Sequence, residues 1–409
     1  MRTNLASVFT STRFQQISRF LHVSDPALEV VRGTPGYDKL QKVRPLIDYS
    51  KKFQECYKLS KYITVDDAMI PFKGRWGIKQ YMKDKPHKWD IKSYVLADAS
   101  TGYVSNFFIY SGKSLDGDAT EGLCTKAVLD LVGSCYNKGQ ILYVDNYYTS
   151  PRLFEILYYN DIYATGTARA NRANYPVEMK KSKHPVPRRA ERGYYRHLSR
   201  GPMTAGIWFD RRYVNFLFTA STPAVQPGEA QPTTERRDGA RKVDILCPPY
   251  LSDYVSYMRG VDRGDQLIAL YGVGRKSRKP WKRIFYYLLE CAILNAYIIE
   301  SFSDPNHETS GRGKRDLKDF ETELASMLID GFVGRGRRLD LDASHLMQKS
   351  TLPHFPVPSP DGKSRRCKVC AIKGGRSESI VFCDVCKVHL CTATAQRKCF
   401  YLFYTVEDL

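Results

Sequence analysis

The segment ILYVDNYYTS, residues 141–150, is an apolar run that ends in a single aspartate, Asp145. Apolar residues at helical spacing precede it at 120–135, and a second helical pattern follows at 150–161, with Ser150 placed to cap it. A charge at the mouth of a buried strand is costly unless a cap, an ion pair or a metal ion stabilises it. The segment therefore predicts a strand between two helices, in an α/β fold, and a partner for Asp145.

Further strands are predicted on both sides of this unit. Alternating apolar patterns at 62–74, 92–100 and 103–112 predict three antiparallel strands, the last two joined by a tight turn. Residues 163–169 predict another strand after the second helix. The predicted order is three strands, helix, strand, helix, strand.

The pattern breaks between 172 and 248, where we expect an insertion. It contains a strand-like run at 207–219 and the segment TPAVQPGEAQPTTER, expected to be a mobile loop. Helical patterns resume at 251–271, at 281–301 and near 316–330. The apolar stretch within the second of these is too short to cross a bilayer, so we predict a core helix and no membrane partner.

Three acidic positions recur in comparable settings: Asp66 with Asp67, Asp145, and Asp262 with Asp265. Carboxylates gathered in space repel one another unless a cation holds them, and oxygen-only ligands suit a hard ion such as Mg²⁺. Two such ions would support phosphoryl transfer by in-line displacement. The alternative is that each aspartate caps a turn or pairs with a nearby cation.

The formal charge of +20 favours a polyanionic partner, with nucleic acid ahead of an anionic membrane surface. Cations are dense in two runs, at 180–200 and at 275–283. We expect the second run, which starts ten residues after Asp265, to hold nucleic-acid phosphates against the carboxylates, with a solvated face as the alternative. The candidate DNA-binding residues are Lys180, Lys181, Arg188, Arg189, Arg275, Lys276, Arg278, Lys279, Lys282 and Arg283.

Six of the eleven cysteines lie between residues 367 and 399. The pairs CKVC and CDVC have the spacing of zinc ligands, and a domain of about 40 residues has too little core to fold without metal. Four ligands complete one zinc site and eight complete two, so one or two Zn²⁺ ions are expected. The seven candidate ligands are Cys367, Cys370, Cys383, Cys386, His389, Cys391 and Cys399.

Four segments resemble, in order, the successive motifs of piggyBac-type transposases and their domesticated, transposable-element-derived relatives. They are TVDDAMIPFKGR at 64–75, ILYVDNYYTSPRLFEIL at 141–157, YATGTAR at 163–169, and the long run at 254–299. The resemblance extends from about residue 13 to 405.

The resemblance implies an RNase H-like core in which Asp66, Asp145 and Asp262 bind Mg²⁺ or Mn²⁺. Asp265, on the same helix face as Asp262, is implied as a nearby fourth acid, while Asp67 stands where the family often has Glu and is expected outside the metal ligands. The implied chemistry on double-stranded DNA is 3′-end nicking at transposon ends, hairpin formation and insertion at TTAA targets. A homodimer and a nuclear location are also implied.

Relatives usually end in a cross-braced cysteine-rich domain that binds transposon-end DNA, and chromatin or protein contacts are the alternative role. Many finish with a CF-x-x-aromatic-His pattern, where this chain has Tyr404. Two other functions stay open: a catalytically silent, domesticated DNA- or chromatin-binding protein, and an RNase H-like nuclease in repair or RNA turnover.

The expected domain organisation is a core built from two parts of the chain, with helices and a zinc domain beside it. The helical dimerisation and DNA-binding region takes 1–61, expected to be truncated, and 272–350. The catalytic core takes 62–171 and 249–271 around an insertion domain at 172–248, and a linker at 351–366 precedes the cysteine-rich zinc finger at 367–409.

Overall fold

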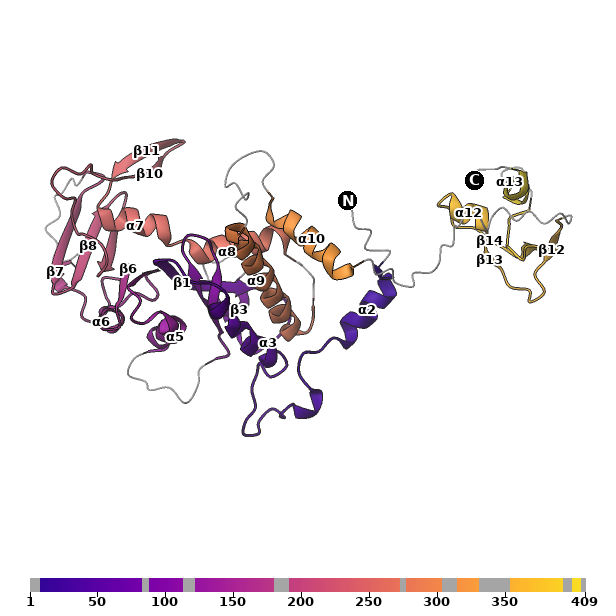
Figure 1. Ribbon diagram of the computed structural model, residues 1–409, viewed down its shortest axis with the longest axis horizontal. Helices are drawn as coiled ribbons and strands as arrows, with labels where there is room; N and C mark the ends of the chain where they lie inside the picture. The colour runs from indigo at the N-terminus through magenta and orange to yellow at the C-terminus, as the bar shows by residue number, and fades with distance from the viewer. Residues whose placement is uncertain are drawn as a thin grey trace. The chain divides into compact units, whose positions relative to one another are not determined.

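The computed structural model (Figure 1) divides into two compact units, one of residues 20–330 and one of residues 1–19 with 331–409. The described residues are 8–82, 88–112, 122–179, 191–272, 277–303, 315–330, 354–392 and 399–405.

The larger unit is built on a sheet in which the described residues contribute nine strands, in the order β2-β3-β1-β5-β6-β9-β8-β7, with β4 paired to β3. The strands are β1 (Tyr62–Ile70), β2 (Lys79–Tyr81), β3 (Trp89–Asp98), β4 (Val104–Ile109), β5 (Gln140–Val144), β6 (Ile162–Ala168), β7 (Tyr195–Arg200), β8 (Met203–Phe209) and β9 (Tyr213–Phe218). The predicted order of strands and helices from β1 to β6 is confirmed, with the short β2 added.

The register of the central strands fixes where the predicted acids lie. β1 pairs antiparallel with β3 but parallel with β5, and Val65 lies opposite Val144. β5 pairs parallel with β6. Asp66 follows Val65 and Asp145 follows Val144, so the two aspartates lie at the same level of neighbouring parallel strands.

Helices cover both faces of this part of the sheet. Side chains alternate between faces along a strand: Tyr94 and Leu96 of β3 join one core cluster, and Val95 and Ala97 join the other. The first cluster includes α5 (Leu123–Val132) and α6 (Pro151–Tyr159), and the second includes α3 (Arg44–Tyr49) and α9 (Pro280–Ser303).

Two local predictions about these helices are confirmed. Ser150 caps α6, since its hydroxyl oxygen accepts the Leu153 N–H at 3.2 Å, and Pro151 occupies the first helical position. By length and composition alone α9 could cross a membrane, but Trp281, Ile284 and Leu288 are buried against the sheet. It is the core helix that the sequence predicts.

The insertion differs from its prediction. The run 207–219 forms two strands, β8 and β9, because Asp210, Arg211 and Arg212 make a polar turn between two apolar halves. Part of the expected mobile loop is ordered as β10 (Thr233–Asp238), which pairs with β11 (Arg241–Leu246). The insertion also extends the main sheet, since β9 pairs antiparallel with β6.

The predicted helix at 251–271 is two helices, α7 (Pro249–Tyr257) and α8 (Gly260–Tyr271). A Cβ atom on Gly260 would lie 2.5 Å from Thr64 Cγ2 and 2.8 Å from the Cα of Ala99. The absence of a side chain at Gly260 therefore lets α8 approach β1 and β3 closely, and it brings Asp262 to the sheet. Beyond α9, α10 (Leu317–Ile329) begins with a capping box at Asp316.

The smaller unit includes the cysteine-rich segment. Two short ladders, β12 (Pro356–Pro358) with β15 (Val381–Cys383) and β13 (Arg365–Arg366) with β14 (Glu378–Ser379), enclose α12 (Lys368–Ile372), and α13 (Cys399–Thr405) follows. Its core consists of Cys367, Val369, Leu390, Cys391 and Cys399. Strands β12 and β13 lie within the expected linker.

We expect Gly260→Ala to destabilise the protein, because the new methyl group would overlap Thr64 and the β3 backbone. Overpacking of this kind costs about 1 to 3 kcal/mol and lowers the melting temperature, which differential scanning calorimetry measures. Gly133→Ala is the control: Gly133 has helical backbone angles, and no atom lies within 4 Å of its new Cβ. Equal melting temperatures for the two variants would contradict the close approach of α8.

Candidate functional site

Three of the predicted acids come from three different elements. Asp66 lies within β1, and its Oδ1 accepts the N–H of Asp67 at 2.7 Å. Asp145 lies one residue beyond β5, and its Oδ1 accepts the N–H of Tyr147 at 2.8 Å. Asp262 is in the first turn of α8. All three are partly buried.

Electrostatic coupling indicates that these three carboxylates are gathered. The pKa of Asp66 is raised to about 7, chiefly by burial; the Asp67 N–H opposes this shift, and the charges of Asp145, Asp67 and Asp262 contribute to it. Burial also raises the pKa of Asp145, and the charge of Asp67 adds to this, while Arg169 lowers it. The site is a partly dehydrated group of like charges.

Asp265 interacts with side chains of α9 rather than with Asp66 and Asp145. Its charge raises the pKa of Tyr287 and of Cys291 on α9, and it is not among the main charges that act on Asp66 or Asp145. Three residues turn a helix by about 300°, so two such side chains diverge by about 60°. The structure therefore groups Asp262, rather than Asp265, with Asp66 and Asp145.

The segment after β5 is a turn, and Asp145 lies at the end of its strand, as predicted. The Thr149 N–H and hydroxyl donate to the Asp145 carbonyl at 3.1 and 2.8 Å, closing the turn. Tyr148 is 1% exposed, so the turn directs its side chain into the core.

Two arginines that the sequence analysis missed hold this turn from the next strand. Arg169 Nε donates to the Asn146 side-chain oxygen at 2.9 Å, and Arg172 donates to the Asn146 carbonyl at 3.1 Å. A Cβ atom on Gly166 would lie 2.2 Å from Thr149 Oγ1, so the close approach needs glycine there. The position of Arg169 as the last residue of the predicted strand at 163–169 was the available signal.

Asp67 has partners of its own. Its Oδ2 lies 2.8 Å from Lys92 Nζ, and its Oδ1 accepts a hydrogen bond from the Tyr148 hydroxyl. This agrees with the expectation that Asp67 is not a metal ligand. Lys92 was also missed, although it is the one cation in the predicted strand at 92–100.

The carboxylates fit a hard divalent cation. Within the described ranges, no Lys or Arg forms an ion pair with Asp66, Asp145 or Asp262, so their charges are not neutralised by a direct partner. Carboxylate oxygens are the ligands that Mg²⁺ and Mn²⁺ prefer. The three are not among the described groups whose ligand atoms all lie within 4.8 Å of one another, so binding a shared ion requires them to move closer.

The structure describes only some of the predicted basic residues. Lys180, Lys181, Arg188, Arg189, Arg275 and Lys276 lie outside the described residues. Arg278 and Lys279 are exposed, as DNA contact requires. Lys282 is 6% exposed, because it lies on the buried face at the start of α9, and this contradicts its predicted contact with DNA. Arg283 Nε donates to the Pro71 carbonyl at 2.9 Å.

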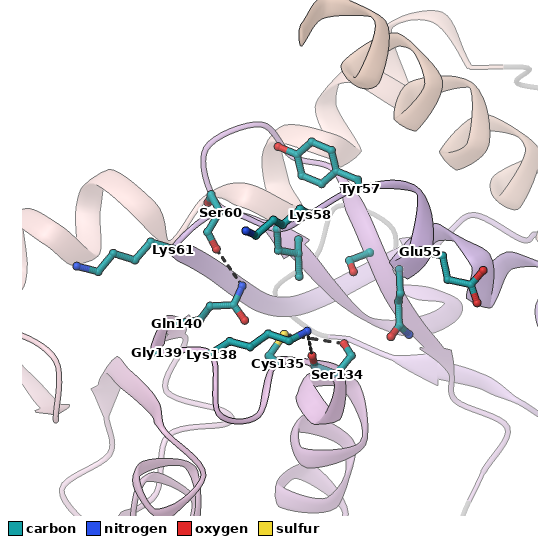
Figure 2. A pocket seen from close by; sticks show the side chains of 13 residues that line it. Glu55, Tyr57, Lys58, Ser60, Lys61, Ser134, Cys135, Lys138, Gly139 and Gln140 are labelled. Atoms are coloured by element: carbon teal, nitrogen blue, oxygen red, sulfur yellow. Dashed lines mark hydrogen bonds between the residues drawn. The ribbon is translucent and has the colours of Figure 1, made fainter. Parts of the chain in front are cut away.

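A separate hollow of about 820 Å³ lies at the amino ends of β1 and β5 (Figure 2). Gln140 Nε2 donates to the Ser60 carbonyl at 2.9 Å, and Lys138 Nζ donates to the Ser134 carbonyl. None of the predicted acids lines this hollow. It is therefore distinct from the carboxylate site further along the same strands.

The cysteine-rich segment contains two groups that can hold a metal ion. The first consists of Cys367, Cys370, Cys391 and Cys399, with the Cys370 sulfur 3.9 Å from that of Cys391 and 3.5 Å from that of Cys399. The second consists of Cys383, Cys386 and His354, whose Nδ1 lies 3.4 Å from both sulfurs. The two groups alternate along the chain.

His389, a predicted ligand, belongs to neither group. Its Nδ1 lies 2.9 Å from the Ser379 carbonyl and its Nε2 accepts a hydrogen bond from Arg365 at 3.1 Å, so both ring nitrogens have protein partners. The histidine among the candidate ligands is His354, which the sequence analysis placed in a linker. Its separation of 29 residues from Cys383 hid it from a search based on local spacing.

Comparison with known proteins identifies the family to which the chain is similar. Residues 2–297 match the family model described as Transposase IS4. Three human proteins are similar: PiggyBac transposable element-derived protein 5 (26% identical over 74% of this chain), protein 3 (26% over 95%) and protein 2 (25% over 90%). The chain spans 57%, 64% and 60% of their respective lengths.

The fold is also similar to a solved one. The chain superposes with a TM-score of 0.70 on a cryo-EM structure of a piggyBac transposase synaptic complex with hairpin DNA. The alignment covers 97% of this chain and 80% of the other, at 21% identity. At that identity the likeness shows a shared α/β fold.

Asp66→Asn is expected to stabilise the metal-free protein more at pH 8 than at pH 5. The pKa of Asp66 is raised from 3.8 to about 7, so the folded parent keeps a proton that the unfolded chain loses. Stability present at low pH is therefore lost as the pH rises towards 7, at a cost on the order of 1 to 4 kcal/mol, and the amide avoids this loss. Urea denaturation at both pH values measures it. A difference between variant and parent that does not change with pH would contradict the acidic surroundings of Asp66.

His354→Ala should lower the amount of metal bound per chain, because it leaves two thiolates in the second group. His389→Ala is the matched control and should leave the metal content unchanged. Elemental analysis of the purified full chain measures both. Loss of metal from the His389 variant alone would show that the assignment of the two histidines is reversed.

Proposed function

The chain belongs to the Transposase IS4 family, with piggyBac-type relatives, and on that premise we propose that it binds double-stranded DNA and catalyses metal-dependent phosphoryl transfer on it. The observation that carries the proposal is the gathering of Asp66, Asp145 and Asp262 from β1, the end of β5 and α8.

The core is proposed to be RNase H-like. Support comes from its strand arrangement, in which β1 pairs antiparallel with β3 and parallel with β5, and β5 pairs parallel with β6. The proposed acids then lie at the carboxyl end of β5 and beside it on β1, where α/β sheets carry ligands.

Asp66, Asp145 and Asp262 are the proposed ligands of Mg²⁺ or Mn²⁺. Two such ions activate an attacking water or 3′-hydroxyl and stabilise the leaving oxygen of an in-line displacement. The exposed Arg169, held by Asn146 beside Asp145, is suited to contact a DNA phosphate, and Arg278 and Lys279 are suited to contact the backbone further away.

The proposed reaction sequence is 3′-end nicking at transposon ends, hairpin formation and strand transfer into TTAA targets. The solved complex of similar fold contains hairpin DNA, which supports the second step. A homodimer and a nuclear location complete the proposal.

For the cysteine-rich segment we propose Zn²⁺ as the metal, bound by the four-cysteine group and by the group containing His354. Tetrahedral thiolate and imidazole ligands favour zinc over harder ions. Its proposed partner is transposon-end DNA, with chromatin or protein contacts as the alternative.

A second candidate is a domesticated DNA- or chromatin-binding protein without catalysis. The names of the human relatives favour it, since they describe proteins derived from a transposable element. This candidate retains the fold and the basic surface but predicts no cleavage.

The decisive measurement is Mg²⁺-dependent nicking of DNA that carries the cognate inverted repeat and flanking TTAA. Asp145→Ala should slow it more than about 100-fold, because even residues that only support metal ligands contribute 10- to 100-fold. Asp244→Ala, on an exposed strand of the insertion, is the control and should cleave normally. Equal cleavage by the Asp145 variant would refute the metal site, and DNA binding without cleavage by the parent would favour the second candidate.

A further inference from the structure

A buried ion pair lies directly beside the proposed metal ligands. Lys92 of β3 and Asp67 of β1 are joined by a contact of 2.8 Å, and their side chains are only 5% and 8% exposed. Desolvating two charges commonly costs as much as their attraction returns, so such a pair contributes little to stability compared with apolar side chains. The position of this ion pair next to Asp66 indicates a role other than stabilising the fold.

The lysine is fixed in position by its surroundings. Its Nζ lies 4.5 Å from the ring centre of Tyr94 and 4.4 Å from that of Tyr147, both within cation–π distance. Tyr94 lies opposite Asp67 and Lys92 lies opposite Met69, so Lys92 and Asp67 are diagonal neighbours on one face of the β1–β3 pair.

The other oxygen of Asp67 reaches the turn that carries Asp145. It accepts the hydroxyl hydrogen of Tyr148, a side chain that is 1% exposed. Lys92 contacts the same turn through the ring of Tyr147, which lies 5.2 Å from the ring of Tyr148. One ion pair therefore ties the strand that carries Asp66 to the turn that carries Asp145.

We propose that Lys92, Asp67 and Tyr148 form a positioning cluster that holds β1, which carries Asp66, beside the turn that carries Asp145 before metal binds. Only the two carboxylate side chains then have to move to share an ion, and the cluster itself contacts neither metal nor DNA. The inference rests on the proposed metal-dependent function. It explains how two like charges stay together in the metal-free protein: Asp66 and Asp145 repel each other, and the buried contacts of their sequence neighbours oppose that repulsion.

The cluster also gives the adjacent residues Asp66 and Asp67 different roles. One oxygen of Asp67 pairs with Lys92 and the other accepts the Tyr148 hydroxyl hydrogen, while Asp66 has no ion-pair partner among the described residues. An incoming divalent ion therefore meets the carboxylate of Asp66, whereas both oxygens of Asp67 already have protein partners.

The test uses Tyr148→Phe, which removes only the hydroxyl group. Its matched control is Tyr175→Phe, because the Tyr175 hydroxyl is also buried and donates a single hydrogen bond, to the Phe216 carbonyl at 3.3 Å. Mn²⁺ binding to the full chain is followed by electron paramagnetic resonance of the free ion, and thermal unfolding is recorded in parallel. Both variants should lose similar stability, but only Tyr148→Phe should bind Mn²⁺ about 10- to 100-fold more weakly.

Lys92→Met provides a second variant, expected to weaken Mn²⁺ binding at least as much if it folds. Equal Mn²⁺ affinity in the parent and in Tyr148→Phe would overturn the positioning role while leaving the proposed function intact. Absence of Mn²⁺ binding by the parent would overturn both. An equal loss of Mn²⁺ affinity in Tyr148→Phe and Tyr175→Phe would show that removing either buried hydroxyl has the same effect. That result would also overturn the positioning role.

Discussion

The parallel pairing of β1 with β5 is the constraint on which the rest of the site depends. It places Val65 opposite Val144, and each is followed by an aspartate. Two carboxylates on neighbouring strands repel, and their shared burial makes the repulsion stronger than it would be in water. The surrounding contacts hold the two aspartates together despite this repulsion.

Those contacts come from every side of the pair. Arg169 and Arg172 hold the turn after β5 from β6, and Lys92 with Asp67 holds it from β3 and β1. Glycines permit the approach: Gly166 makes room for the turn, and Gly260 makes room for the helix that carries Asp262. The charged residues and the glycines therefore serve one purpose, which is to bring three acids together from distant parts of the chain.

Sequence patterns predicted the central elements well because those elements have strong local signals. Apolar runs separated by glycine or charged turns identified β1, β3 and β4, and Ser150 located the start of α6. Local patterns were wrong where a short polar break was overlooked, as at Asp210 between β8 and β9. They also could not predict which way Asp265 faces, because that depends on how α8 packs against α9. His354 was missed because its partners, Cys383 and Cys386, are distant in the sequence.

The alternation of the two cysteine groups along the chain sets an order on their completion during synthesis. His354, Cys383 and Cys386 have all left the ribosome before Cys391, whereas the pair Cys367 and Cys370 must wait for Cys399. The ligands of the group that begins first are therefore available first, and they close a loop that contains Cys367 and Cys370 before the partners of that pair have been made. A chain that lacked Cys391 and Cys399 would keep only two of the four ligands of the first group, too few to complete a tetrahedral metal site.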